Sequence, residues 1–142
     1  MIVIDTRPLV AAANERDDHH QHCLDYLETA PGPLIVPAPV VVEVCYFLES
    51  RRGHHASATF LHQLVDGTLS YIELTAADLQ RMEHLVGQYT DLPLGAVDAS
   101  VIAIAERLKV ADIATLDHRE VVPGLGVRCR VRGAGPAGVV PG

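Results

Sequence analysis

The chain begins with the stretch Met1-Ile2-Val3-Ile4-Asp5. Four apolar residues in a row predict a short strand, and Asp5 stands where that strand ends. A carboxylate is rarely buried unless it is paired or holds a metal ion. Asp5 is therefore the first candidate functional residue.

Strand-like and helix-like segments alternate along the rest of the chain. Pro8 falls in the first turn of the helix expected after Asp5, where proline is tolerated best, and Pro31-Gly32-Pro33 ends the next helix. Further helices are expected at residues 17–27, from the prolines at 37 and 39 to about 52, at 55–65, from about 75 to about 89, and from 98 to 108–109. The fourth of these begins with Thr75 as N-cap and Asp78 as the acidic residue three positions later. Strands are expected at 1–5, 34–36, 69–74, 113–116 and 127–131. This alternation predicts an α/β fold with a mainly parallel central sheet of four to five strands flanked by helices.

Composition limits the class of protein. The 142 residues suit a single domain, and 49% of them are hydrophobic. No apolar run approaches the ~20 residues that a membrane span needs, and no signal peptide is visible at the N-terminus. The three cysteines are widely spaced, which disfavours thiolate zinc and a disulfide framework. A cytoplasmic protein without membrane contact is expected.

The formal net charge of −7 opposes tight binding of nucleic acid by the protein alone, because phosphate contacts need cations. Bound divalent metal ions would neutralise part of the acidic charge. Positive charge is also clustered, at Arg51-Arg52 and at Arg128, Arg130 and Arg132. The charge therefore lowers the expected affinity for RNA without excluding catalysis on it.

Three further acids resemble Asp5 in lying at or within apolar segments. Glu43 interrupts the run from Val40 to Leu48, Asp98 opens a helix-like stretch, and Asp117 follows the expected strand at 113–116. Mg²⁺ and Mn²⁺ prefer hard oxygen ligands, and two such ions clamp the attacking water and the leaving oxygen in phosphodiester hydrolysis. Four acids fit a nuclease better than a glycosidase, which needs one carboxylate pair.

The motifs that carry these acids point to a known family. They are Ile4-Asp5-Thr6 after the first strand, Val42-Glu43-Val44 in the third helix, Leu94-Gly95-Ala96-Val97-Asp98-Ala99 at a helix start, and Thr115-Leu116-Asp117 after the fourth strand. In order and spacing they resemble the PIN-domain ribonucleases, specifically the VapC-type toxins of bacterial toxin–antitoxin pairs. The resemblance covers about residues 1–131 as one PIN-like domain, and residues 132–142 are expected to form a flexible Gly/Pro-rich tail.

The resemblance implies a Mg²⁺-dependent endoribonuclease toxin that cleaves single-stranded regions of structured RNA through metal-activated water, with Mn²⁺ as a second candidate ion. It makes Asp5 and Asp98 the metal ligands, and Glu43 and Asp117 complete the catalytic acids. It also implies a cognate antitoxin protein as partner and a homodimer. Which RNA is cut is left open.

Residues beside the acids are given supporting roles by the same resemblance. Thr6 and Thr115 are expected to be polar support for the pocket. Arg7 departs from the family pattern, which commonly has a small polar residue there. An arginine at that position is a candidate phosphate contact, or it partly occupies the pocket and lowers activity.

Structural explanations remain for each acid. Asp5 could cap a strand end, Asp98 could complement a helix dipole, Glu43 could reach solvent from a helix edge, and Asp117 could belong to a turn. Asp91 is a candidate peripheral acid or a loop cap. His19, His20 and His22 suit a solvated helix face better than a metal site, because consecutive helical residues point in different directions.

Two other functions compete with the nuclease, a binding module and a phosphotransfer domain. A catalytically weak PIN-like module that binds RNA or a protein partner is favoured by Arg7 and by the acidic charge. A phosphotransfer domain is disfavoured, because the only lysine is Lys109 and because Asp5-Thr6-Arg7 lacks the Asp-x-Asp pattern of the phosphatases.

Overall fold

The computed structural model describes residues 1–88, 94–116 and 128–129. Asp117, Asp91 and the Gly/Pro-rich tail lie outside these residues. The helices and strands in chain order are β1 (Ile2–Ile4), α1 (Thr6–Ala13), α2 (His20–Thr29), β2 (Leu34–Pro37), α3 (Ala38–Arg52), α4 (His54–Val65), β3 (Ser70–Ile72), α5 (Ala76–Gln88), α6 (Ala96–Arg107), β4 (Asp112–Ala114) and β5 (Arg128–Cys129).

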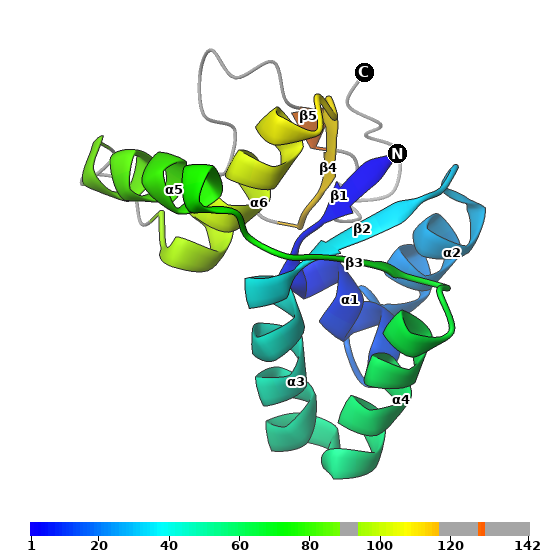
Figure 1. Ribbon diagram of the computed structural model, residues 1–142. Helices are drawn as coiled ribbons and strands as arrows, with labels where there is room; N and C mark the ends of the chain where they lie inside the picture. The colour runs from blue at the N-terminus through cyan, green and yellow to red at the C-terminus, as the bar shows by residue number, and fades with distance from the viewer. Residues whose placement is uncertain (89–93, 117–127, 130–142) are drawn as a thin grey trace.

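The five strands form one sheet in the order β3-β2-β1-β4-β5 (Figure 1). Every neighbouring pair is parallel, so the predicted parallel sheet of four to five strands is confirmed. β1 is the central strand, and Val3 and Ile4 on it are completely buried. A strand that is covered on both faces needs apolar residues at successive positions, which explains the unbroken apolar run at the start of the chain.

Helices cover both faces of the sheet. The connections from β1 to β2 and from β2 to β3 carry α1–α4, whereas the return from β3 to β4 carries α5 and α6. Connections between parallel strands are right-handed. The chain crosses the sheet in one direction from β1 to β3 and in the opposite direction from β3 to β4, so α5 and α6 lie on the opposite face from α1–α4 (Figure 1). The apolar stripes of α3 and α6 were expected to be core or dimer packing. Val44, Leu48, Val101, Ile102 and Ala105 are buried, whereas Val41 is only partly buried against the same core.

Most bounds lie within a residue or two of the sequence prediction, but β3 is shorter than the strand expected at 69–74, β4 ends at Ala114 and not at residue 116, and two helix starts differ. α2 begins at His20 rather than at residue 17, because the Asp17 carboxylate accepts a hydrogen bond from the His19 backbone nitrogen at 2.8 Å and folds these residues into a turn. α6 begins at Ala96, so Asp98 lies in the middle of its first turn instead of opening it. Gly95 occupies the N-cap position.

Ion pairs fasten α5 to α6. Asp78 forms the predicted reciprocal cap with Thr75 and also accepts hydrogen bonds from Nε of Arg107, 3.0 Å from each carboxylate oxygen. Arg81 binds Glu106 through two nitrogens, at 2.9 and 3.1 Å. Burial alone would raise the pKa of Asp78, but the hydrogen bonds from Thr75 and Arg107 outweigh it and hold the pKa below its ordinary value. The helix that carries Asp98 is therefore anchored by charge as well as by packing.

Within the ranges that the structure describes, no helix is long and apolar enough to cross a membrane.

Candidate functional site

Asp5 lies at the carboxyl end of the central strand and at the N-terminus of α1. Its side chain is only 3% exposed. Oδ1 accepts a hydrogen bond from the Thr6 backbone nitrogen at 2.8 Å, and the Asp5 backbone nitrogen donates to the Ala114 carbonyl at 2.9 Å. The helix N-terminus favours the anionic form of the carboxylate. Asp5 therefore has a capping role, as one explanation from sequence allowed, and that role fixes the carboxylate at the sheet edge.

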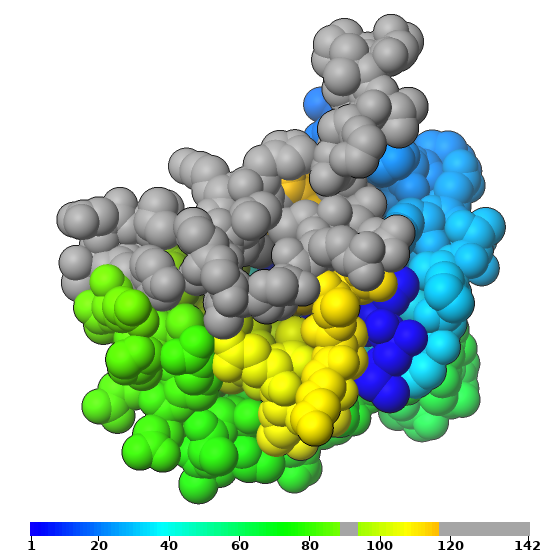
Figure 2. All heavy atoms as spheres, turned by 90° about the horizontal axis from the view of Figure 1, so that it is seen from above, coloured from blue at the N-terminus to red at the C-terminus, as the bar shows by residue number. Residues whose placement is uncertain are grey.

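This edge is the point where the strand order reverses. After β1 the chain proceeds to β2 on one side, and it returns much later to β4 on the other side. β1 pairs with both β2 and β4. Figure 2, seen from above and so from the side where the chain starts, shows dark blue residues from the start of the chain between the cyan and yellow surfaces. In open parallel sheets, ligands bind outside the strand ends at such a reversal.

Two threonines flank the Asp5 carboxylate, and their hydroxyl groups differ. The hydroxyl of Thr115, which follows β4, donates to Oδ2 of Asp5 at 3.1 Å across a separation of 110 residues. Thr6 is 2% exposed, and its Oγ1 has no hydrogen-bond partner among the described residues. Both threonines were predicted to be polar support, and the structure brings both of them to Asp5.

Asp98 is half-buried in the first turn of α6. Its Oδ2 accepts a long hydrogen bond, 3.4 Å, from the Gly95 backbone nitrogen. An acid in the first turn is stabilised by the helix dipole, so Asp98 has the structural role that the sequence allowed. α6 packs against β1 and β4, the two strands that hold Asp5 and Thr115. Weak engagement by Gly95 leaves most of the binding capacity of the carboxylate for a cation.

Glu43 is half-buried in the second turn of α3, which starts directly after β2. It has no hydrogen bond or ion pair with another described residue, and its neighbour Val42 is 71% exposed. α3 packs against α1 and α6, the helices that begin at Asp5 and just before Asp98. Three of the four predicted acids, Asp5, Glu43 and Asp98, thus lie on or beside elements that contact one another.

Convergence of all four predicted acids stays a prediction. Asp117 lies outside the described residues. Among the residues that are described, no three His, Cys, Asp or Glu side chains lie close enough together to hold a metal ion, so Asp5, Glu43 and Asp98 do not form such a group by themselves. A hydrated Mg²⁺ takes only one or two carboxylates directly, so it does not require three adjacent acids.

Arg7, the candidate phosphate contact, is exposed on α1. Burial and the charge of Asp17 raise the pKa of the Cys23 thiol on α2 to about 11, and the Arg7 charge opposes that rise. A phosphate contact by Arg7 remains a prediction.

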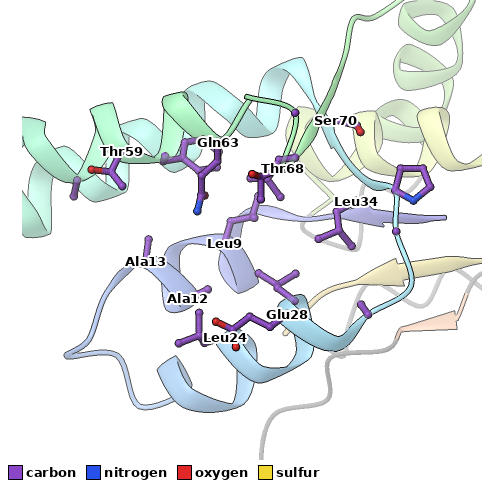
Figure 3. Close-up of a pocket in the computed structure, with 18 of the residues that line it drawn as sticks. Leu9, Ala12, Ala13, Leu24, Glu28, Leu34, Thr59, Gln63, Thr68 and Ser70 are labelled. Carbon is purple, nitrogen blue, oxygen red and sulfur yellow. The ribbon is translucent and has the colours of Figure 1, made fainter. Parts of the chain in front are cut away.

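A large groove on the α1–α4 face was not predicted from sequence. It has a volume of about 800 Å³ and is lined by apolar side chains of α1, α2 and α4, among them Leu9, Leu24, Leu27 and Phe60 (Figure 3). Asp5, Glu43 and Asp98 do not line it. The sequence held one signal for the groove, the apolar face of the second helix with Cys23, Leu24 and Leu27. Of these three residues only Cys23 is fully buried, and the two leucines line the groove.

Comparisons with known proteins agree with the geometry. The chain is 28% identical over 118 residues to Ribonuclease VapC26 of Mycobacterium tuberculosis, an alignment that covers 83% of this chain and 87% of that protein. Its fold is similar to that of M. tuberculosis VapC20, a toxin that cleaves the sarcin–ricin loop, with a TM-score of 0.78, 18% identity, and coverage of 82% of this chain and 90% of the other. A toxin–antitoxin complex from Klebsiella pneumoniae matches with a TM-score of 0.69 and 18% identity, covering 90% of this chain and 96% of the other.

The family assignment rests on most of the chain. Residues 2–121 match the PIN domain, a span that includes the four predicted acids and both threonines. The resemblance to VapC-type toxins that the motifs indicated is thereby confirmed, and the chain belongs to the PIN domain family.

Proposed function

We propose that the protein is a Mg²⁺-dependent endoribonuclease toxin of a toxin–antitoxin pair, with Mn²⁺ as an alternative ion. The observation that carries this proposal is the buried Asp5 carboxylate at the strand-order reversal, hydrogen-bonded to Thr115. A buried anion at a ligand-binding edge, in a PIN domain related to a ribonuclease, supports cleavage of phosphodiesters. The proposed substrate is the single-stranded part of a structured RNA, where the backbone is accessible.

The residues present fit a divalent ion. Asp5 and Asp98 would hold it, and both supply hard carboxylate oxygens. The buried Thr6 hydroxyl has no partner among the described residues, which is costly unless a polar ligand or water satisfies it. When bound, Mg²⁺ would lower the pKa of a coordinated water and stabilise charge that develops on the phosphate.

The protein groups contribute position and charge. Thr115 and the Thr6 backbone nitrogen orient the Asp5 carboxylate through the two hydrogen bonds already described. Glu43, which has no partner among the described residues, is available to accept a proton from an attacking water. Asp117 is proposed as the fourth acid on the strength of the family resemblance. Arg7 is proposed to contact the scissile phosphate or to weaken activity by crowding the pocket.

The first test replaces Asp98 with Asn. This change keeps the size of the side chain and removes the anion, so the protein should fold normally while cleavage of cellular RNA with Mg²⁺ or Mn²⁺ falls by at least about 100-fold. Growth arrest on expression should disappear at an equal protein level. Asp5→Asn should be equally severe, and Glu43→Gln milder if that residue acts through water.

The matched control for this test is Asp18→Asn, because Asp18 is an exposed acid without a hydrogen bond to any other described residue. It should leave cleavage and growth arrest unchanged. Persistent arrest with Asp98→Asn, at a protein level equal to wild type, would contradict the metal-site assignment.

A cognate antitoxin is the proposed inhibitor. The similarity to the K. pneumoniae toxin–antitoxin complex supports such a partner. The groove between α1, α2 and α4 offers an apolar surface for it. The predicted acids would suit a basic segment of the antitoxin that reaches the site. Glu15 and Glu28 on the groove wall could pair with basic residues of such a partner, and Arg52 and His55, which line the same groove, with acidic ones.

A homodimer is proposed as the toxin's assembly. Val42 and Tyr46 form an exposed apolar pair on one face of α3, 71% and 65% exposed, and Leu79 is 54% exposed on α5. Large exposed apolar side chains that recur on one helix face are typical of protein interfaces. Light scattering should give twice the monomer mass at micromolar concentration, and Tyr46→Lys should shift it towards the monomer.

The alternative is a PIN-like module that binds RNA or a partner and cuts weakly or not at all. The absence of a three-residue metal-binding group within the described residues and the presence of Arg7 favour this alternative. If the purified protein cuts no cellular RNA with Mg²⁺ or Mn²⁺ but retains RNA in a binding assay, this function replaces the nuclease.

A further inference from the structure

We infer that the side-chain hydroxyl of Thr6 holds a water molecule of the hydrated metal ion at Asp5, so that Thr6 is a positioning residue of the site. This inference rests on the proposed function. It goes beyond general polar support, because it assigns one hydroxyl group to one kind of ligand.

The first observation is the state of the hydroxyl. Thr6 is 2% exposed, and no described residue accepts from or donates to its Oγ1. Buried hydroxyls almost always have a partner, and one left without it loses its hydrogen bonds to water and gains nothing in exchange. A buried hydroxyl without a partner among the described residues therefore leaves a place for a bound polar ligand.

The second observation is its place. The Thr6 backbone nitrogen donates to Oδ1 of Asp5 at 2.8 Å. The Thr6 hydroxyl is attached only a few bonds from that nitrogen, so it lies in the immediate neighbourhood of the Asp5 carboxylate. Mg²⁺ usually keeps several waters and binds only one or two carboxylates directly. A water of an ion held at Asp5 would therefore be a suitable partner for Oγ1.

Thr115 provides the contrast. Its hydroxyl is also buried beside Asp5, but it donates to Oδ2 of that carboxylate at 3.1 Å. The two threonines therefore have different partners. Thr115 orients the Asp5 carboxylate, and Thr6 orients the water bound to the ion. Replacing each by valine removes a hydroxyl with little change of shape, and the two replacements should have different effects.

The experiment compares full-length wild type with Thr6→Val, Thr6→Ser and Thr115→Val. Mn²⁺ alone is titrated by calorimetry, and thermal unfolding is followed without metal. Thr6→Val should bind Mn²⁺ about 10-fold more weakly, as loss of groups around a metal's direct ligands does, while its metal-free melting temperature equals or exceeds that of wild type. Thr6→Ser keeps the hydroxyl and should restore Mn²⁺ affinity.

Thr115→Val should behave differently, with a metal-free melting temperature lower by roughly 3–6 °C because Asp5 loses a buried donor. The inference is overturned if Thr6→Val binds Mn²⁺ as tightly as wild type, or if it unfolds earlier than wild type without metal. In either case the proposed nuclease stands, provided that wild type binds Mn²⁺ and cuts RNA. If wild type neither binds Mn²⁺ nor cuts RNA, the proposed function is wrong, and this inference, which rests on it, is wrong as well.

Discussion

The two faces of the sheet are built differently. On one face, α5 and α6 are joined by two arginine–carboxylate pairs and by a small apolar cluster of their own, made of Met82, Leu85, Ala99, Ile102 and Ala103. On the other face, α1, α2 and α4 pack on the main core but leave a groove of about 800 Å³ between them. The first face fixes the helix that carries Asp98, and the second presents an apolar surface to a partner.

This difference suits the proposed division of work. A metal ligand must be held within a fraction of an ångström, and cross-linking the helix that carries it serves that purpose. A surface that receives a partner segment must instead leave room for side chains that come from elsewhere. We therefore expect identical substitutions on the two faces to have unequal effects on the free protein.

Leu85→Ala should have the largest effect. Leu85 is completely buried between α5 and α6, so its truncation leaves a cavity and should lower the free energy of unfolding by about 3 kcal/mol. For a chain of this size that is a fall in melting temperature of roughly 6–12 °C. Calorimetry or circular dichroism would measure it, and a loss below about 1 kcal/mol would show that the pair is not tightly packed.

Asp78→Asn should come next. The substitution removes a buried charge that accepts hydrogen bonds from Thr75 and Arg107, and the free energy of unfolding should fall by about 2 kcal/mol. Because Arg107 is one-third exposed, solvent screens part of its charge, and this figure is at the lower end for charged pairs.

The same substitution should change the pH dependence of stability. Asp78 has a lowered pKa in the folded protein, so it binds fewer protons there than in the unfolded chain. Its contribution is complete above the unfolded pKa of about 3.9 and is lost as the pH falls through the lower, folded pKa. Wild type should lose stability more steeply than Asp78→Asn below about pH 4. Parallel curves for the two proteins would contradict the assigned shift.

Local patterns allowed most of the fold to be predicted from the sequence. The apolar strand runs, Pro31-Gly32-Pro33 and the Thr75–Asp78 cap are short-range signals, and the elements lie where these signals place them. The turn at Asp17 was missed because the Asp17 side chain competes with the helix for the backbone nitrogen of His19.

Features that depend on long-range contacts were harder to predict from the sequence. Asp78 was recognised as a capping residue, but its bond to Arg107 spans 29 residues and leaves no local signature. At the site, the family resemblance was the reason to expect Thr6 and Thr115 beside Asp5. The structure brings both threonines to Asp5. The groove depends on how three helices pack, which no periodicity in a single helix specifies.

The smallest expected effect on the free protein is that of Leu24→Ala, the counterpart of Leu85→Ala on the other face. Leu24 is half-buried and lines the groove, so its truncation enlarges a space that is already open and leaves no sealed cavity. The free energy of unfolding should change by less than about 1 kcal/mol. Binding of a cognate antitoxin should nevertheless weaken about 5–10-fold, because the partner's apolar side chains would lose contact area there. Calorimetry on the free protein and titration with the antitoxin measure the two effects separately. A stability loss equal to that of Leu85→Ala would remove the distinction between the faces, and unchanged antitoxin affinity would show that the groove is not where the partner binds.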